Sequence, residues 1–327
     1  MAQSVQTSTG LSVAASQGGP LAPEMASARK SVLALRDESA ATLVVSGADR
    51  VTWLNGLVTC DLLRAVRAAD DASYGLVVGR MGRVIVDAVI VVDGVRVYLT
   101  VPAAALETVR AHLDHYLVME DAEVTVGEGL ESWSLHGPGS AEVLRAARAA
   151  GAAGGVLDRT GLGGATIVAP EGQAAQVSAA IVRAVADARG TVGDGAAWEA
   201  LRLERAVPRF GVDFDDKTYP QEASLEKVAV SFDKGCYLGQ EVVCMLELRG
   251  HVKRKLAALV FDSPAAPSPK AEVADATGTP VGEITSAVVS PTLGVAVGLA
   301  MLKPSHAEAG AVVHVGGERA KVVHRPA

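Results

Sequence analysis

Two apolar runs, residues 84–92 and 95–101, flank the dipeptide Asp93-Gly94. Both runs are rich in valine, which favours strands, and Asp-Gly is a strong signal for a two-residue hairpin turn. The pair therefore predicts antiparallel pairing. Residues 103–118 follow with apolar positions at three- and four-residue spacing, which predicts a helix. Antiparallel strands mixed with helices favour an α+β fold over a doubly wound parallel sheet.

A second segment of mixed character follows the first helix. It predicts strands over residues 132–135 and 166–168 and helices over 141–150 and 173–189. We therefore expect a first α+β unit over residues 29–123 and a second over 124–250.

The two ends of the chain differ from this middle part. After residue 256, helical periodicity stops, prolines appear, and short valine-rich runs alternate with glycine turns. Regular short strands of this kind predict a small β-barrel, which we place at residues 251–327. Residues 1–28 begin with a stretch rich in Ser, Ala, Gln and Gly, and we predict a disordered extension there.

Composition narrows the possible functions. The chain has 327 residues, of which 49% are hydrophobic, yet no run approaches the roughly 18 apolar residues that cross a bilayer. A net charge of −7 disfavours general nucleic-acid binding. The three cysteines, Cys60, Cys236 and Cys244, fit neither a disulfide framework nor a zinc site, so we expect no metal site and a cytoplasmic setting.

The octet at residues 234–241 reads Lys-Gly-Cys-Tyr-Leu-Gly-Gln-Glu. Glycine on both sides of Cys236 permits positive φ or a close approach of the backbone. A cation such as Lys234 favours the thiolate, which is the reactive form of cysteine. The alternative is a buried cysteine in a tight turn.

Further landmarks occur in a fixed order along the chain. They lie at residues 53–61, 81–87, 201–213, 219–223 and 278–302. Together with the octet, they resemble the YgfZ-type folate-binding proteins of iron–sulfur cluster assembly, which are relatives of the glycine cleavage T protein. The resemblance covers about residues 33–323 and implies two α+β units followed by a small C-terminal β-barrel.

The resemblance implies a function as well as a fold. It implies that the chain binds tetrahydrofolate or a one-carbon derivative and supports the assembly or repair of iron–sulfur clusters. Assembly factors or client enzymes would be its protein partners, with no nucleic acid and no membrane. A folate-dependent aminomethyltransferase and a non-catalytic folate-binding scaffold are the alternatives.

Two acidic residues are the first candidates for ligand contacts. At the position of Glu204, the resemblance implies a contact to the pterin, whose amino group and ring N–H can both donate to one carboxylate. Arg202 lies beside it in the same segment. Asp87 lies on an apolar strand, where a carboxylate needs a hydrogen bond or a cavity. The alternatives are a surface position for Glu204 and a half-solvated sheet face for Asp87.

The octet supplies the remaining candidates. Cys236, Lys234 and Asp87 are the predicted catalytic residues, with the thiol handling sulfur, iron or a one-carbon group. The predicted folate contacts are Glu204, Arg202, Tyr237, Gln240, Glu241 and Arg249. The basic group over residues 249–255 is either a solvated strand edge or a rim for an anionic ligand.

The sequence departs from the family pattern at four positions, which are Cys60, Val86, Ala206 and Met245. The histidines at 112, 115 and 136 have no catalytic neighbours in sequence, and we expect structural roles for them.

Overall fold

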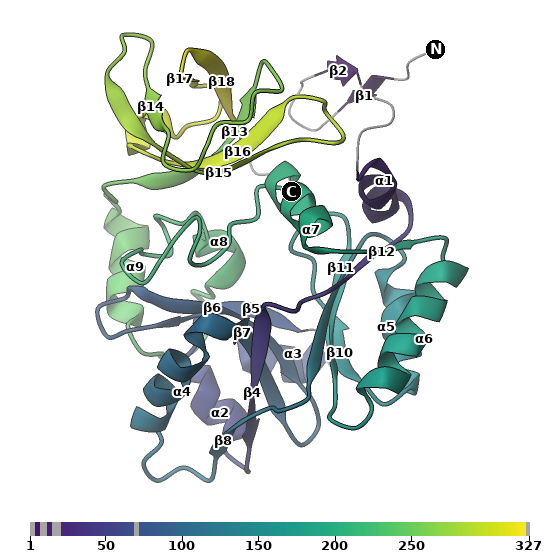
Figure 1. Cartoon of the computed structure of the whole chain (residues 1–327). Helices are drawn as coiled ribbons and strands as arrows, with labels where there is room; N and C mark the ends of the chain where they lie inside the picture. Colours follow the sequence, from purple (N-terminus) through teal and green to yellow (C-terminus); the bar gives the residue numbers. More distant parts are fainter. Residues whose placement is uncertain (1–3, 7–11, 15–20, 69–71, 325–327) are drawn as a thin grey trace.

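The computed structural model describes residues 4–6, 12–14, 21–68 and 72–324. They fold into three packed parts, with two α+β units side by side and a β-barrel against one end of both (Figure 1). The predicted α+β fold with a C-terminal barrel is confirmed.

The first sheet has five antiparallel strands in the order β5-β6-β7-β4-β8. Their bounds are β4 Ala40–Ser46, β5 Ser73–Val78, β6 Val84–Val92, β7 Val97–Pro102 and β8 Glu123–Val126. Helices α2 (Arg50–Asn55), α3 (Leu62–Ala68) and α4 (Leu106–His115), the last preceded by the 3-10 turn η1 (Ala103–Ala105), complete this unit. Because helices cover one face of β6 and the second sheet lies against the other, this strand is apolar along almost its whole length.

The second sheet runs in the order β10-β11-β9-β3-β12. Its strands are β3 Leu33–Arg36, β9 Glu131–His136, β10 Ala153–Val156, β11 Gly164–Ala169 and β12 Thr191–Gly193, and only the β12–β3 pair is parallel. The amphipathic helices α5 (Ser140–Ala149) and α6 (Ala174–Asp187) cover one face. Helices α1 (Ala22–Lys30) and α7 (Gly195–Glu204) pack on the other face beside β3.

The barrel closes in the order β13-β16-β15-β14-β17-β18. Its strands are β13 Lys255–Phe261, β14 Glu272–Ala274, β15 Pro280–Val289, β16 Ala296–Leu302, β17 Val312–Val315 and β18 Glu318–Val323, with the 3-10 turn η2 (Pro304–His306) before β17. All seven residues of β16 are buried, because one face lines the barrel core and the other packs against the end of α7. Two short helices, α8 (Glu226–Ala229) and α9 (Gln240–Arg249), connect the second unit to the barrel.

Two strands cross the predicted unit boundary. β3 was expected in the first unit, yet it pairs in the second sheet between β9 and β12. β8 was expected to open the second unit, yet it pairs with β4 at the edge of the first sheet. The chain therefore exchanges one strand between the two units, which local sequence patterns do not reveal.

The predicted disordered extension is wrong for its last part. Residues 22–28 belong to helix α1, and Met25 and Ala28 are buried against the second sheet. Earlier in the extension, residues 4–6 pair with residues 12–14, and the others up to residue 20 lie outside the described residues.

Smaller differences concern a turn and a helix end. Asp93 and Arg96 exchange backbone hydrogen bonds, so the hairpin turn is centred on Gly94-Val95, one residue later than predicted. Helix α4 is shorter than the predicted 103–118 helix, because its first three residues form a 3-10 turn and it ends at His115.

Candidate functional site around the glycine-flanked cysteine

The octet begins in the loop between α8 and α9, its last two residues open α9, and the loop is attached to the first unit. The N–H of Ser231 donates to the carbonyl oxygen of Thr59 at 2.9 Å, and that of Leu238 donates to Gly56 at 2.9 Å. These bonds hold both ends of the loop against the segment between α2 and α3.

Lys234 anchors the middle of this loop. Its Nζ donates to the carbonyl oxygens of Asn55 at 2.6 Å, Val58 at 2.8 Å and Cys60 at 2.7 Å. These three bonds use all three ammonium protons. Burial lowers the pKa of Lys234 from 10.5 to about 8. This geometry favours an anchoring role for Lys234 over the predicted action on the Cys236 thiol, since its protons are committed to carbonyl oxygens of residues 55–60.

Cys236 is one of the exposed residues of this attached loop. Its side chain is exposed, whereas Lys234 and Tyr237 on either side are buried. Gly239 has φ 78°, and a Cβ there would collide with the carbonyl oxygen of Gly79. A Cβ at Gly235 would meet nothing, so only the second glycine is required by the packing. The alternative of a buried Cys236 is excluded.

The four residues after Cys236 that were predicted to bind a ligand do not converge. The side chain of Gln240 accepts a hydrogen bond from the Tyr237 N–H at 3.3 Å and so caps its own turn. Glu241 and Arg249 are exposed at opposite ends of α9, about 12 Å apart along the axis. Burial raises the pKa of Tyr237, whose hydroxyl has no hydrogen-bond partner among the described residues.

Asp87 lies in a second polar group, between the two sheets. The hydroxyl of Tyr74 donates to its Oδ2 at 2.9 Å, and a guanidinium nitrogen of Arg159 lies 3.8 Å from the same atom. The Arg159 guanidinium also lies over the Tyr74 ring, 4.0 Å from its centre. Burial raises the pKa of Asp87, opposed by the Arg159 charge and the Tyr74 hydrogen bond. The Tyr74 and Tyr237 rings belong to one apolar cluster, which links Asp87 to the octet.

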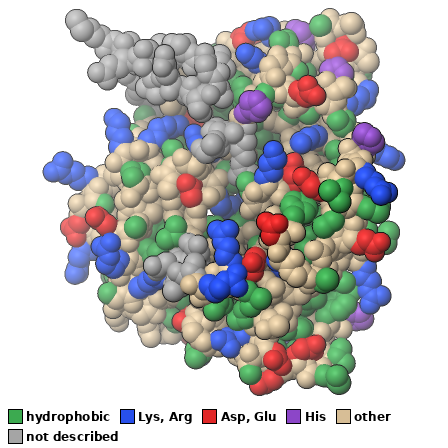
Figure 2. Space-filling view, turned by 180° about the vertical axis from the view of Figure 1, so that it is seen from behind, with side chains coloured by type: hydrophobic (Ala, Val, Ile, Leu, Met, Phe, Trp, Pro, Cys, Tyr) green, Lys and Arg blue, Asp and Glu red, His purple; other side chains and the backbone are tan. Residues whose placement is uncertain are grey.

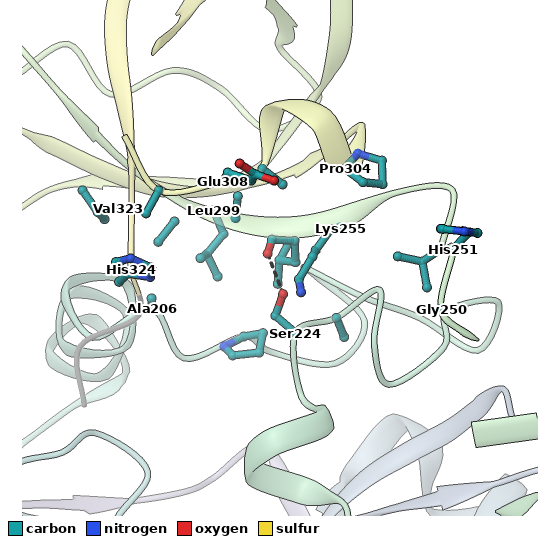
Figure 3. A pocket seen from close by; sticks show the side chains of 18 residues that line it. Ala206, Ser224, Gly250, His251, Lys255, Leu299, Pro304, Glu308, Val323 and His324 are labelled. Atoms are coloured by element: carbon teal, nitrogen blue, oxygen red, sulfur yellow. Dashed lines mark hydrogen bonds between the residues drawn. The ribbon is translucent and has the colours of Figure 1, made fainter. Parts of the chain in front are cut away.

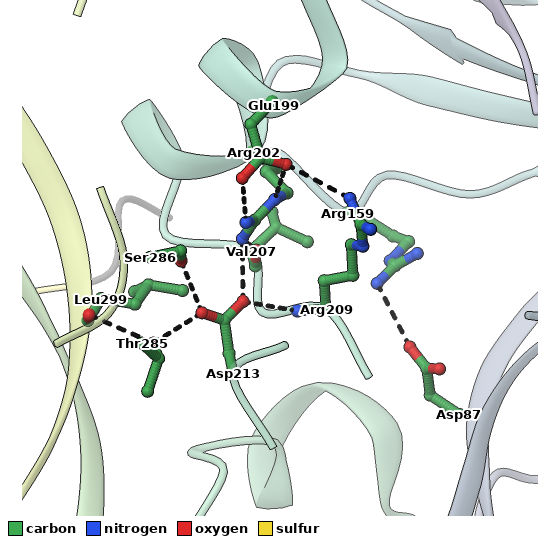
Figure 4. A network of polar contacts seen from close by, with 10 residues as sticks. All are labelled: Asp87, Arg159, Glu199, Arg202, Val207, Arg209, Asp213, Thr285, Ser286 and Leu299. Atoms are coloured by element: carbon green, nitrogen blue, oxygen red, sulfur yellow. Dashed lines mark hydrogen bonds and ion pairs between the residues drawn. The ribbon is translucent and has the colours of Figure 1, made fainter. Parts of the chain in front are cut away.

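Arg202 is part of a buried network that joins α7 to the barrel (Figure 4). Its guanidinium has no exposed surface, donating to the Glu199 carboxylate and, at 2.8 Å, to Asp213. Asp213 in turn accepts from Thr285 and Ser286 of β15 at 2.6 and 2.5 Å. This arrangement supports the fold and presents no Arg202 donor to a ligand, so it disfavours the predicted folate contact.

Glu204 makes a comparable junction at the end of α7. Its carboxylate accepts from Arg29 of α1 at 2.6 Å, from the Ser290 hydroxyl at 2.5 Å, and from the N–H and hydroxyl of Thr292 at 3.1 and 3.0 Å. Only 2% of the side chain is exposed. A pterin could reach this carboxylate only by displacing protein donors, so the structure disfavours this predicted contact as well.

Two positions were missed or underrated in the sequence. Arg159 lies in the loop between β10 and β11, where no local pattern marks it. His136, expected to be structural, stacks on Trp198 with ring centres 5.1 Å apart. Burial lowers the pKa of His136 to about 3, and the Arg159 charge acts in the same direction.

Among the described residues, no helix is both long and apolar enough to cross a bilayer, and no three potential ligand side chains are grouped to hold a metal ion. Figure 2 shows basic and acidic side chains interspersed over the rear face rather than gathered into one basic surface.

Comparison with known proteins identifies the superfamily. Residues 254–327 match the glycine cleavage T-protein C-terminal barrel domain. The chain is 26% identical to the tRNA-modifying protein YgfZ of Aliivibrio fischeri, over 74% of each chain. The chain is similar in sequence to YgfZ-type members of the glycine cleavage T-protein superfamily, and its barrel matches the family's barrel domain.

Other members of the T-protein superfamily agree with this assignment. The Nostoc sp. aminomethyltransferase is 28% identical over 83% of this chain and 77% of its own length. The match to the 34% identical aminomethyltransferase of Saccharopolyspora erythraea spans only 32% of that protein. The aminomethyltransferase T structure from Bartonella henselae, 19% identical, has the same fold, with a TM-score of 0.79 over 99% of this chain and 94% of that one.

Proposed function

We propose that this chain is a tetrahydrofolate-binding protein that supports the assembly or repair of iron–sulfur clusters. The observation that carries the proposal is the exposed thiol of Cys236 on a loop held by Lys234. An exposed thiol on a fixed backbone can react with a partner's sulfur or iron without first being uncovered. The name of the YgfZ relatives, tRNA-modifying proteins, agrees with client enzymes that modify tRNA.

Asp87 is the carboxylate that we propose for the folate contact. Tyr74 and Arg159 both contact Oδ2, and 11% of the side chain is exposed, so the carboxylate retains acceptor capacity for a ligand. Tyr74 and Arg159 hold the carboxylate in place. Tetrahydrofolate bound here would supply its one-carbon chemistry, and the protein groups would orient it. A hydrogen bond from folate to a buried carboxylate is stronger than one between neutral groups, so its loss should lower the affinity for folate measurably.

The cluster role is tested in bacterial cells that lack their own family member. We expect the chain to restore methylthiolation of tRNA by a [4Fe–4S] enzyme, and Cys236→Ser to abolish the restoration. Cys244→Ser, a half-buried thiol on α9, is the matched control and should retain it. Full activity of Cys236→Ser at equal protein levels would refute the cluster role of this thiol.

The folate contact is tested separately with purified protein. We expect tetrahydrofolate to bind in a calorimetric titration, and Asp87→Asn to weaken it about 10-fold or more. Equal affinity in the variant would remove Asp87 from the site. Aminomethyl transfer in the presence of the other glycine cleavage proteins, unaffected by Cys236→Ser, would instead make the chain an aminomethyltransferase.

A further inference from the structure

A cavity of about 710 Å³ lies between the barrel and the segments that lead into it. Its walls come from the end of α7, the turn before α8, the linker that follows α9, and strands β13 and β16 (Figure 3). None of the candidate site residues, from Asp87 to Arg249, lines it. It is therefore separate from both the octet and the Asp87 group.

Small side chains leave this space open. Six alanines line the cavity, at positions 206, 223, 257, 258, 307 and 309. Leu256, Leu299 and Val323 supply the larger apolar contacts. A volume of this size with apolar walls is typical of pockets for small organic molecules.

Ionisable groups surround the apolar walls. Lys255 reaches toward Ser224 in the middle of the cavity, with His324 at one end and His251 at the other (Figure 3). Glu308 is the one acidic side chain in the lining. Cationic or titratable nitrogens therefore outnumber carboxylates in this lining, although the whole chain carries a net charge of −7.

Most of these polar groups are not engaged by the protein. The side chains of His251, His324 and Glu308 make no hydrogen bond or ion pair with the described residues, which end at His324. Lys255 has one long ion pair, 3.5 Å from Glu226, and 41% of its side chain is exposed. The buried Glu226 takes one ammonium proton, so the other two remain free to donate to a ligand without breaking this pair. Ser224 is unavailable as a donor, because its hydroxyl already donates to Leu256 at 2.8 Å.

We propose that this cavity is a second ligand site, which binds a small amphipathic carboxylate. The apolar body of the ligand packs on the alanine and leucine walls, and its carboxylate pairs with Lys255. Area buried in the walls supplies affinity, whereas the single central ammonium selects the anion over a neutral analogue. The site is independent of the proposed folate and cluster roles.

The test compares two probes of one shape. 4-Phenylbutyrate carries the charge, and 4-phenylbutyramide is its neutral counterpart; binding of each to the full chain is followed by ligand-observed NMR titration. We expect the carboxylate to bind saturably and about 10-fold tighter than the amide. Lys255→Met should remove that difference, and Lys255→Arg should largely preserve it. Lys253→Met, an exposed lysine outside the lining, is the matched control.

A second variant blocks the cavity without altering the core. Ala309 is exposed at the rim, so Ala309→Trp can cover the opening while the fold is retained. We expect it to abolish binding of both probes with an unchanged melting temperature. Absence of saturable binding to the unmodified chain, or equal binding in the Ala309→Trp variant, would overturn the proposal.

Discussion

The ammonium nitrogen of Lys234 lies 2.6 Å from the carbonyl oxygen of Asn55, the last residue of helix α2. The last carbonyls of a helix have no partner within it, and a cation at this end satisfies them. The lysine of the octet therefore closes a helix of the first unit, and the loop that carries Cys236 is fixed by that contact.

Loss of this anchor should destabilise the protein. Lys234→Met would leave three carbonyls without their donor, and we expect the free energy of unfolding to fall by about 3 kcal/mol or more. Lys227→Met, an exposed lysine on α8, should change it by less than about 0.5 kcal/mol. Urea unfolding of both variants checks this. A Lys234→Met protein of normal stability but reduced thiol reactivity would return Lys234 to the role of thiol activator.

The three thiols should differ in reactivity. Cys236 is exposed, Cys244 is half-buried, and burial raises the pKa of Cys60 to about 12. We expect iodoacetamide at pH 8 to modify Cys236 first and Cys60 at least about 100-fold more slowly, because both access and thiolate are lacking there. Peptide mass spectrometry over time measures the order. Rapid modification of Cys60 in the native protein would contradict the packing of this thiol against Gly75.

Local patterns predicted the parts of the fold that depend on neighbouring residues. The hairpin of β6 and β7 and the short strands of the barrel follow from alternation and turn residues. The places of β3 and β8 do not, because partners far apart in sequence decide which sheet a strand joins.

The candidate site shows the same difference between features set by neighbouring residues and features set by partners far apart in sequence. The octet marked Cys236, but nearness in sequence suggested a Lys234–thiol contact, whereas the ammonium donates to backbone carbonyls of the first unit. Arg159 and Asp213 lie in loops without periodicity, and only their contacts with Asp87 and Arg202 reveal them. Glu204 was expected to accept from a pterin, yet its donors are Arg29 of α1 and two residues that follow β15 in the barrel.

Asp213 should be critical for holding the barrel. Asp213→Asn removes the charge opposite the fully buried Arg202, and breaking such a pair costs about 3–5 kcal/mol. The exposed Asp216→Asn is the control. Chemical unfolding gives the stability, and limited proteolysis of the 249–255 linker tests whether the barrel loosens. Equal stability of the two variants would mean that Arg202 finds another partner.

Helix α6 ends in a strained residue that can be improved. Arg189 is exposed with φ 55°, a conformation that glycine adopts without strain. Arg189→Gly should raise the free energy of unfolding by about 0.5–1 kcal/mol, the strain relieved exceeding the added entropy of the unfolded chain. Arg183→Gly, exposed within the same helix, should lower it by about 1 kcal/mol. Thermal unfolding separates the two, and a loss in both variants would argue against strain at Arg189.

Acid should destabilise the protein partly through His136. Burial lowers its pKa from 6.5 to about 3, so between these values the folded state binds fewer protons at this site than the unfolded state. The stability due to neutral His136 is therefore complete above about pH 6.5 and is lost as the pH falls toward 3.

Between pH 7 and 5, the free energy of unfolding of the unmodified protein should fall by about 2 kcal/mol more than that of His136→Gln, which cannot titrate. The exposed His115→Gln serves as the control and should keep the wild-type slope. Unfolding by urea across this pH range measures the slopes. Parallel curves for His136→Gln and the unmodified protein would show that His136 titrates alike in the folded and unfolded states, which would contradict its burial as a neutral ring.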